Sequence, residues 1–394
     1  MRIELTPQQK NDQVAFKAFV DEAILPYARQ YDRTEQTPIS LIKEIAQKGY
    51  LGALLPKNIG GMGMEVVTYG LLNEEIGRGC SSIRSLLTVH NMVAQALFKW
   101  GSKFQKEYWL PKLASGEVIA AFALSEPNIG SDAKHVETTA TVSGDSYILN
   151  GQKKWITYGQ VADVFLVFAR QENESVTFLV EKDNPGLSIK PIFGMLGVRA
   201  SMLAELHLNN CRIPQKNLVG RQGFGFSHVA SSALDYGRYS VAWGCVGIAQ
   251  ASLEACLQYT SQRQQFGVYL KEHQLIQQMI TEMMVNVKAA RLLCYQAGYL
   301  KDIGDPKSII ETSIAKYFAS MIATRVANDA VQIHGGNGCS SEYPVQRYWR
   351  DAKIMEIIEG STQIQQITIA EYGYQQQAFL TNRVKVPRGL AVGR

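Results

Sequence analysis

One carboxylate in the last tenth of the chain stands where a base for proton abstraction could be built. Glu359 follows the largely apolar segment 354–358 and precedes Gly360. A carboxylate that such a segment delivers to a bend is expected to lose water, which disfavours its charged form and raises its pKa. Glutamates with raised pKa values take protons from carbon near neutral pH. The alternative is an ordinary helix end at Glu359, with Gly360 as its C-cap and the acid in solvent, and on this stretch alone it is the commoner arrangement.

The residues that follow Glu359 favour a more specific interpretation. The string Glu359-Gly360-Ser361-Thr362-Gln363-Ile364-Gln365 resembles the C-terminal signature of the acyl-CoA dehydrogenases, Glu-Gly-Thr-x-x-Ile-Gln, with Ser361 in place of the usual threonine. The resemblance implies that Glu359 removes the proton α to a thioester carbonyl while a hydride leaves the β carbon for N5 of FAD. It also implies that the backbone N–H of Glu359 and a ribityl hydroxyl of FAD stabilise the enolate oxygen as an oxyanion hole.

Some members of that family carry the base on the first long helix of the C-terminal bundle instead. The matching segment here is Leu234-Asp-Tyr-Gly-Arg238, and Gly237 occupies the position of that base, where a glycine cannot act. The resemblance therefore assigns the base to Glu359. It places Asp235 and Arg238 at the pantetheine end of the thioester.

Two motifs in the middle of the chain resemble the segments that hold the flavin ring in this family. The stretch Ser125-Glu-Pro-Asn-Ile-Gly130-Ser131-Asp is similar to Thr-Glu-Pro-x-x-Gly-Ser-Asp, and Gly151-Gln-Lys-Lys-Trp155-Ile-Thr157 is similar to Gly-x-Lys-x-Trp-Ile-Thr. By themselves the first could be a surface turn and Trp155 a core aromatic. The resemblance implies that Trp155 packs against the isoalloxazine and that the Thr157 hydroxyl bonds near N5.

Two further segments resemble those that reach the dinucleotide half of an FAD bound mainly by a neighbouring subunit. They are Arg263-Gln-Gln265-Phe266-Gly and Gln332-Ile-His-Gly335-Gly336-Asn-Gly. The resemblance implies a homo-oligomer, a tetramer built as a dimer of dimers. No Gly-x-Gly-x-x-Gly follows an expected strand, which argues against a Rossmann nicotinamide site.

The site residues that these comparisons imply form two groups. Those assigned to FAD are Phe122, Leu124, Ser125, Gly130, Ser131, Trp155, Thr157, Arg263, Gln265, Phe266, Gln332, Gly335, Gly336, Ser361 and Gln363. Those assigned to the substrate are Arg84, Ser131, Asp235, Arg238 and Gly360.

Arg84 belongs to a polar stripe on an expected helix. Arg84, Thr88 and Asn91 share one helical face, and such a stripe is usually a solvated surface. The sequence pattern Arg84-Ser-x-x-Thr88-Val also resembles the segment of glutaryl-CoA dehydrogenases in which the arginine pairs with the far carboxylate of the substrate. It is similar, too, to carrier-linked dehydrogenases that make hydroxymalonyl-type extender units. Both comparisons imply a short acyl group that bears a carboxylate or hydroxyl.

The elements that must position these residues change in character along the chain. Helical periodicity runs from Leu5 to about Leu113 and begins at a Thr6-Pro7 start signal. Strand patterns follow at 118–124, 164–168, 176–180 and 203–208. We expect a hairpin over 146–156, because Asn150-Gly151 fits a two-residue turn. After the glycine-rich link 220–225, helical spacing returns and stays.

This order predicts a mainly α protein with a middle β domain. We expect an N-terminal helical domain (1–117), a small β-barrel (118–228), a C-terminal four-helix bundle (229–380) and a basic, disordered tail (381–394). The same order of domains is found in the acyl-CoA dehydrogenases, so the resemblance covers nearly the whole chain.

Composition argues against several other classes of protein. The net charge of +5 over 394 residues is not gathered into runs, so we do not expect nucleic-acid binding. Six cysteines without Cys-x-x-Cys spacing and six dispersed histidines predict neither a metal site nor a disulfide framework. No membrane-length apolar run and no signal peptide occur, so we expect a cytoplasmic protein without a membrane span.

Partners follow from the resemblance alone. It implies a thioester of coenzyme A or of an acyl carrier protein as substrate, which the sequence does not separate, and an electron-transfer flavoprotein or another acceptor. An acyl-carrier-protein-linked dehydrogenase of a biosynthetic pathway is therefore an alternative. A non-catalytic flavoprotein homologue is the alternative of another class, and intact Glu359 and flavin motifs argue against it.

Overall fold

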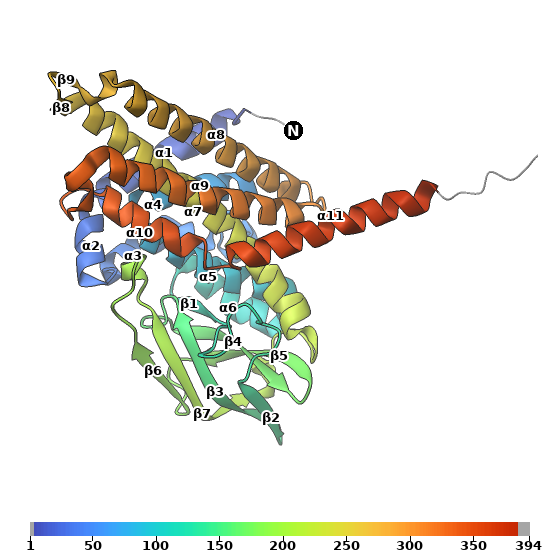
Figure 1. Ribbon diagram of the computed structural model, residues 1–394. Helices are drawn as coiled ribbons and strands as arrows, with labels where there is room; N and C mark the ends of the chain where they lie inside the picture. The colour runs from blue at the N-terminus through green and yellow to red at the C-terminus, as the bar shows by residue number, and fades with distance from the viewer. Residues whose placement is uncertain (1–3, 385–394) are drawn as a thin grey trace, which may run out of the picture.

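The computed structural model describes residues 4–384 and consists of two groups of helices that pack together above a β-sheet region (Figure 1). The N-terminal and C-terminal helices contribute to one common hydrophobic core, which includes Phe16, Leu72 and Leu86 from the first group and Trp243, Ala319 and Met355 from the second. Segments far apart in the sequence therefore build one helical body. The predicted order of helices, strands and helices is confirmed.

The N-terminal helices are short at first and then long and buried. They are α1 (Pro7–Ala23), α2 (Ala28–Thr34), α3 (Ile39–Gln47), α4 (Val66–Gly79), α5 (Ser81–Trp100) and α6 (Lys103–Ser115). The start signal at Thr6-Pro7 is a capping box, because the Thr6 side chain accepts from the Gln9 N–H while the Gln9 side chain accepts from the Thr6 N–H. Helix α5 is buried from Ser81 to Leu97, so even its polar residues lie in the interior.

The strands form one seven-stranded sheet in the order β1-β4-β2-β3-β7-β6, with β5 paired to β4. Their bounds are β1 (Ala120–Ala123), β2 (Thr139–Ser143), β3 (Ser146–Ile156), β4 (Val164–Gln171), β5 (Glu174–Glu181), β6 (Leu187–Pro191) and β7 (Ala204–Pro214). Strands β2 and β6 were missing from the sequence prediction, because both are short and half-exposed and lack a continuous apolar run. Two short strands, β8 (Gln264–Gln265) and β9 (Val268–Tyr269), form a separate ribbon.

The hairpin predicted over 146–156 is wrong. Residues 146–156 form the single strand β3, and its pairing with β7 shifts register between Leu149 and Gly151. Asn150 and Gly151 therefore mark a bulge. Glycine is needed there because a Cβ on Gly151 would lie 2.5 Å from Oγ1 of Thr138. The turn that joins β2 to β3 is at Gly144, which has a φ of 64°.

The C-terminal helices are longer. A π-helical turn (Gly225–Ala230) leads into α7 (Ser231–Gln262), which is followed by α8 (Gln274–Asp302), α9 (Ser308–His334), α10 (Val345–Met355) and α11 (Thr362–Val384). Figure 1 shows α11 leaving the body of the protein. Helix α11 extends four residues into the segment predicted as a tail, and the rest of that segment, 385–394, lies outside the described residues. Within residues 4–384, the segment Gly225–Gln262 is long and apolar enough to cross a membrane, but 78% of its most apolar window is buried in the protein, as in a core helix.

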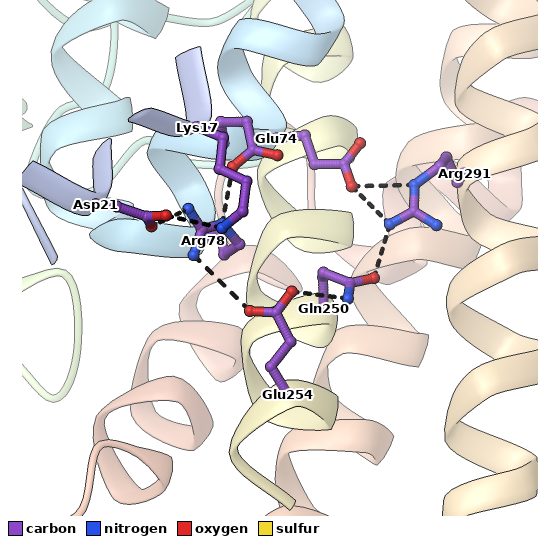
Figure 2. Close-up of polar contacts among 8 residues, drawn as sticks. Lys17, Asp21, Glu74, Arg78, Gln250, Glu254 and Arg291 are labelled. Carbon is purple, nitrogen blue, oxygen red and sulfur yellow. Dashed lines mark hydrogen bonds and ion pairs between the residues drawn. The ribbon is translucent and has the colours of Figure 1, made fainter. Parts of the chain in front are cut away.

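Helices α4 and α7 approach closely because glycines face the partner helix. A Cβ on Gly77 would lie 2.9 Å from Cα of Gly244, and one on Gly247 would lie 2.2 Å from the Glu74 carbonyl oxygen. Beside this contact lies the network of buried and exposed charges in Figure 2. Arg78 pairs with Glu75 at 2.8 Å and with Asp21 of α1 at 2.5 Å, and Arg291 of α8 donates to Glu74 at 2.6 Å. These pairs link α4 to α1 and α8, and Arg291 also donates to Gln250 of α7 at 2.9 Å.

Two contacts fix the sheet region against the helices. The Val198 N–H donates to Oδ1 of the buried Asp351 of α10 at 2.6 Å. The Tyr158 hydroxyl donates to the Ser82 carbonyl oxygen of α5 at 3.1 Å. The position of α10 is thus set by both the helical body and the sheet.

Candidate active site

Glu359 lies in the link between α10 and α11. Helix α10 ends at Met355, so Glu359 is not the last residue of a capped helix, and the helix-end alternative is wrong. Glu359 and Gly360 both have left-handed backbones, with φ values of 54° and 85°. A left-handed conformation at a glutamate costs about 1–3 kcal/mol and persists only where the surroundings impose it. We call these two residues the catalytic turn, after the role that the sequence predicts for Glu359.

Glu359 is partly exposed as a residue, but one oxygen of its carboxylate is enclosed. Its Oε2 is buried and makes no hydrogen bond within the described chain. Burial raises the pKa of Glu359 to about 7, although the positive charges of Arg238, Lys316 and Arg84 favour the ionised form. The carboxylate is therefore desolvated and close to half-ionised at neutral pH. This is the state that the sequence predicted for a base.

Three cationic or amide side chains hold the carbonyl oxygens of the catalytic turn. Arg238 Nε donates to the Glu359 carbonyl oxygen at 3.3 Å, and Lys316 Nζ donates to that of Gly360 at 2.7 Å. Gln365 Nε2 donates to both at 3.2 Å. The Glu359 N–H has no hydrogen-bond partner within residues 4–384. The turn thus presents one free donor beside one free carboxylate.

Arg84 is completely buried, so the solvated-surface interpretation is wrong. Its guanidinium donates to Oγ1 of Thr88 at 2.6 Å and contacts Sδ of Met355 at 3.5 Å, while Nε has no partner. Within the described chain no carboxylate oxygen lies within ion-pair distance of it. Burial lowers the pKa of Arg84, and Glu359 is among the groups whose charge opposes that shift. Arg84 is a buried cation that has no counterion within ion-pair distance in the described chain and that interacts electrostatically with Glu359.

The two middle motifs are joined by a buried ion pair. Lys153 Nζ lies 2.6 Å from Oε1 of Glu126, with both side chains almost fully buried, and it also donates to the Leu124 carbonyl oxygen at 3.2 Å. The Lys154 N–H donates to the Ser125 carbonyl oxygen at 2.9 Å. The structure therefore brings Leu124, Ser125 and the Trp155 strand together. Phe122 lies on the adjoining strand β1 and is buried.

Trp155 is not a core aromatic. Its side chain is 47% exposed and its φ is 64°, at a second register shift between β3 and β7. A bulge of this kind turns a side chain away from the regular alternation. Thr157 directly follows β3 and is half-buried, while Gly130 and Ser131 are exposed, with open space where a Cβ of Gly130 would be. An exposed indole beside a loop of free main-chain groups fits a planar ring with polar edges.

The dinucleotide segments lie elsewhere. Arg263 directly precedes β8, Gln265 lies in it, and Phe266 lies in the turn of the ribbon, between β8 and β9, and is 96% exposed. Figure 1 shows this ribbon at the end of the molecule opposite the sheet. Gln332 is exposed near the end of α9, and Gly335 and Gly336, which follow it, have open space around them. One chain therefore does not bring these residues to Trp155. An exposed phenylalanine and open glycines fit a surface that meets a second chain.

Of the remaining predicted residues, Asp235 lies on α7, while Ser361 and Gln363 follow the catalytic turn in the chain. Asp235 forms an ion pair with Lys301, which is buried. Ser361 Oγ accepts weakly from the Ile364 N–H at 3.4 Å at the start of α11, and Gln363 is exposed. Sequence reasoning missed Lys316, Lys153 and Gln365 as functional candidates. A signal for Lys316 existed, because it stands at helical spacing between Thr312 and Ala319 on the buried face of α9.

Three family models match the chain in succession. They are the acyl-CoA dehydrogenase N-terminal domain (residues 6–117), middle domain (121–211) and C-terminal domain (223–373). Rat mitochondrial short-chain specific acyl-CoA dehydrogenase is 40% identical over 358 residues, which cover 89% of this chain and 86% of the rat protein.

Solved structures agree with the family models. Butyryl-CoA dehydrogenase of Megasphaera elsdenii is 34% identical, with a TM-score of 0.91 over 94% of this chain and 99% of that one. A glutaryl-CoA dehydrogenase of Mycobacterium smegmatis in complex with FADH2 is 31% identical, with a TM-score of 0.89 over 93% and 95%. On these matches, together with a buried carboxylate at the signature position, the chain belongs to the acyl-CoA dehydrogenase family and is an FAD-dependent oxidoreductase that acts on CH–CH bonds of acyl-CoA.

Proposed function

We propose that the protein desaturates a short acyl-CoA and that Glu359 is the base that takes the α proton. The observation that supports this assignment is the enclosed, unpaired Oε2 with its raised pKa, held in a strained turn. A carboxylate near half-ionisation is suited to accept a proton from carbon and later to release it. The short chain length is supported by similarity to short-chain and butyryl-CoA dehydrogenases.

The same turn supplies charge stabilisation. The free Glu359 N–H is proposed to donate to the thioester carbonyl oxygen, whose negative charge grows as the α proton leaves. Arg238, Gln365 and Lys316 hold the two carbonyl oxygens of the turn, so the N–H is oriented before substrate arrives. Asp235 and Arg238 are proposed at the pantetheine end of the substrate, and Gly360 and Ser131 as further substrate contacts.

FAD, when bound, accepts the hydride from the β carbon. We propose that Phe122, Leu124, Ser125, Gly130, Ser131, Trp155 and Thr157 hold its ring half. Ser361 and Gln363 are proposed as further FAD contacts of the same chain. Arg263, Gln265, Phe266, Gln332, Gly335 and Gly336 are proposed to hold the dinucleotide half of a second chain's FAD. A homotetramer and a cytoplasmic location, with an electron-transfer flavoprotein as acceptor, complete the proposal.

Arg84 is proposed to select the far end of the acyl group. A buried guanidinium with an unsatisfied Nε and no carboxylate partner carries a desolvation cost that an anionic or hydroxylated ligand would offset. This supports a short acyl group with a polar end. The similarity of the chain to a glutaryl-CoA dehydrogenase agrees with such a substrate.

Anaerobic bleaching of the bound flavin tests the proposal directly. Butyryl, hexanoyl, glutaryl and 3-hydroxybutyryl thioesters would each be added as coenzyme A and as acyl-carrier-protein derivatives. Rapid bleaching by short coenzyme A thioesters is expected. Bleaching by carrier-protein thioesters alone would favour the biosynthetic alternative, and a flavin that no thioester bleaches would overturn the proposed function.

A further inference from the structure

A lysine buried in the middle of α9 contacts the catalytic turn. Lys316 has no exposed surface, and its Nζ donates to the Gly360 carbonyl oxygen at 2.7 Å. Within the described chain no carboxylate lies within ion-pair distance of Nζ. Burying a lysine without a counterion is costly. A cation kept in the core at that cost, and joined to the turn that carries the base, suggests a role in the reaction.

The groups around Lys316 come from each neighbouring element. On α7 lie Cys245, a thiol whose pKa burial raises to about 12, and Arg238. The α10–α11 link contributes Glu359 and Glu356, and Glu356 is already paired with Lys353 at 2.9 Å. Burial lowers the pKa of Lys316 to about 8, so it is mostly charged at neutral pH. Of these two carboxylates, Glu359 is thus the one without an ion-pair partner, and its charge balances that of Lys316.

We propose that Lys316 is a positioning residue for Glu359, which holds the left-handed turn through the Gly360 carbonyl oxygen and favours the ionised carboxylate through its charge. The inference rests on the proposed role of Glu359 as the base. The two parts of the role are separable. The hydrogen bond fixes where the carboxylate points, and the charge sets the pH at which it is ready.

The geometry explains why a lysine suits this place. Arg238 and Gln365 already donate to the Glu359 carbonyl oxygen, whereas at Gly360 only the weaker Gln365 bond at 3.2 Å accompanies Lys316. Without Nζ, the Gly360 carbonyl would keep one long hydrogen bond in a turn whose two residues are both left-handed. The turn would relax, and a misplacement of about 1 Å can cost about 100-fold in rate.

The sign of the charge effect is fixed by the chemistry. A protonated lysine stabilises the carboxylate and lowers the pKa of Glu359. Removing the charge raises that pKa, so a higher pH is needed to ionise the base. The acid limb of the pH–rate profile should therefore shift to higher pH in a variant that is neutral at position 316.

Two variants separate the hydrogen bond from the charge. Lys316→Met removes both, while Lys316→Gln keeps an N–H donor and removes the charge. Lys288→Met, at an exposed lysine of α8, is the matched control. Single-turnover bleaching by butyryl-CoA would be followed from about pH 5.5 to about pH 9, where the base titrates. FAD content and thermal unfolding would be measured on each preparation.

We expect the acid limb of the pH–rate profile to shift to higher pH by about one unit in both Lys316 variants, with FAD retained. The plateau rate should fall about tenfold or more in Lys316→Met and less in Lys316→Gln. An acid limb that stays at the same pH in Lys316→Gln would overturn the inference. This test still holds if Lys316→Met does not fold. If the parent protein is not bleached by any thioester, or if Glu359→Gln is bleached normally, the proposed function fails instead.

Discussion

The Glu359 carboxylate occupies the space that a side chain at position 237 would fill. A Cβ on Gly237 would lie 2.4 Å from Oε2 of Glu359 and 2.7 Å from Sδ of Met92. Both atoms belong to flexible side chains, so a small residue could be admitted if the carboxylate and the buried Met92 side chain moved. Gly237 is therefore the neighbour that lets the base point where it does.

Gly237→Ala should separate activity from stability. We expect the protein to fold and to keep FAD, because only two flexible side chains must shift. The rate of flavin bleaching should fall about tenfold or more, since the displaced carboxylate no longer meets the α carbon. Stopped-flow bleaching with thermal unfolding on the same sample measures both. An unchanged rate would mean that Oε2 does not need its present position.

Glu359→Gln should retain FAD and lose reduction by substrate. The amide preserves shape and removes basicity, so the rate should fall by about 100-fold to 10,000-fold, while affinity for butyryl-CoA, measured by flavin spectral perturbation, should change little. Glu371→Gln, at an exposed glutamate of α11, makes the same change of charge and is the matched control. Near-normal bleaching in Glu359→Gln would place the base elsewhere.

The raised pKa of Glu359 also predicts a pH-dependent stability difference. The unfolded carboxyl ionises near 4.5 and the folded one near 7. Between these values the folded state binds more protons, so the stabilising contribution is present at low pH and is lost as pH rises through 7. The full cost above pH 7 is about 3 kcal/mol.

Glu359→Gln removes this cost, since glutamine does not titrate. Its unfolding free energy relative to the parent should therefore rise between about pH 5 and about pH 8. Urea unfolding at the two pH values gives the comparison. A difference that stays constant with pH would show that Glu359 is not desolvated in the folded protein.

Lys153→Met should release the flavin. The substitution leaves Glu126 buried without its cation, which typically costs about 3–5 kcal/mol, and it frees the Leu124 carbonyl oxygen that borders the proposed ring site. We expect a lower Tm and loss of FAD on gel filtration. The neighbouring Lys154→Met, at a partly exposed lysine paired with Glu205, is the matched control. Full FAD retention in Lys153→Met would contradict the role of this ion pair.

Periodicity was enough to predict the helices, because apolar spacing survives in long buried elements such as α5, which lies within the stretch of helical periodicity from Leu5 to about Leu113. The strand that carries Trp155 was misread for a physical reason. Asn150-Gly151 serves equally in a tight turn and in a bulge. The close approach of Thr138, which lies just before β2 and outside the segment 146–156, decides between them. The same limit applies to Lys316, whose role depends on a carbonyl 44 residues further along the chain.

Arg84 shows how a helical face can mislead. Its polar stripe has the spacing of a solvated surface, but α7 covers it, and Ser240 of α7 lies 2.6 Å from the Thr88 hydroxyl. The stripe became an internal polar network because another helix supplied the partners. Only the tertiary packing shows that the arginine is enclosed.

Arg84→Met should change which substrate is used and not whether one is used. Methionine fills similar space without charge, and replacing a buried cation that has no counterion is often neutral for stability. Butyryl-CoA has no polar end, so its bleaching rate should stay within a few-fold. Glutaryl and 3-hydroxybutyryl thioesters would lose a charge-assisted hydrogen bond of about 1.5–3 kcal/mol, which is about a 10-fold to 100-fold loss in kcat/KM. Arg33→Met, at an exposed arginine of α2, controls for the loss of one positive charge. Equal losses on butyryl-CoA and on the polar thioesters would assign Arg84 to the framework of the site, since a selecting residue must discriminate by the group that it contacts.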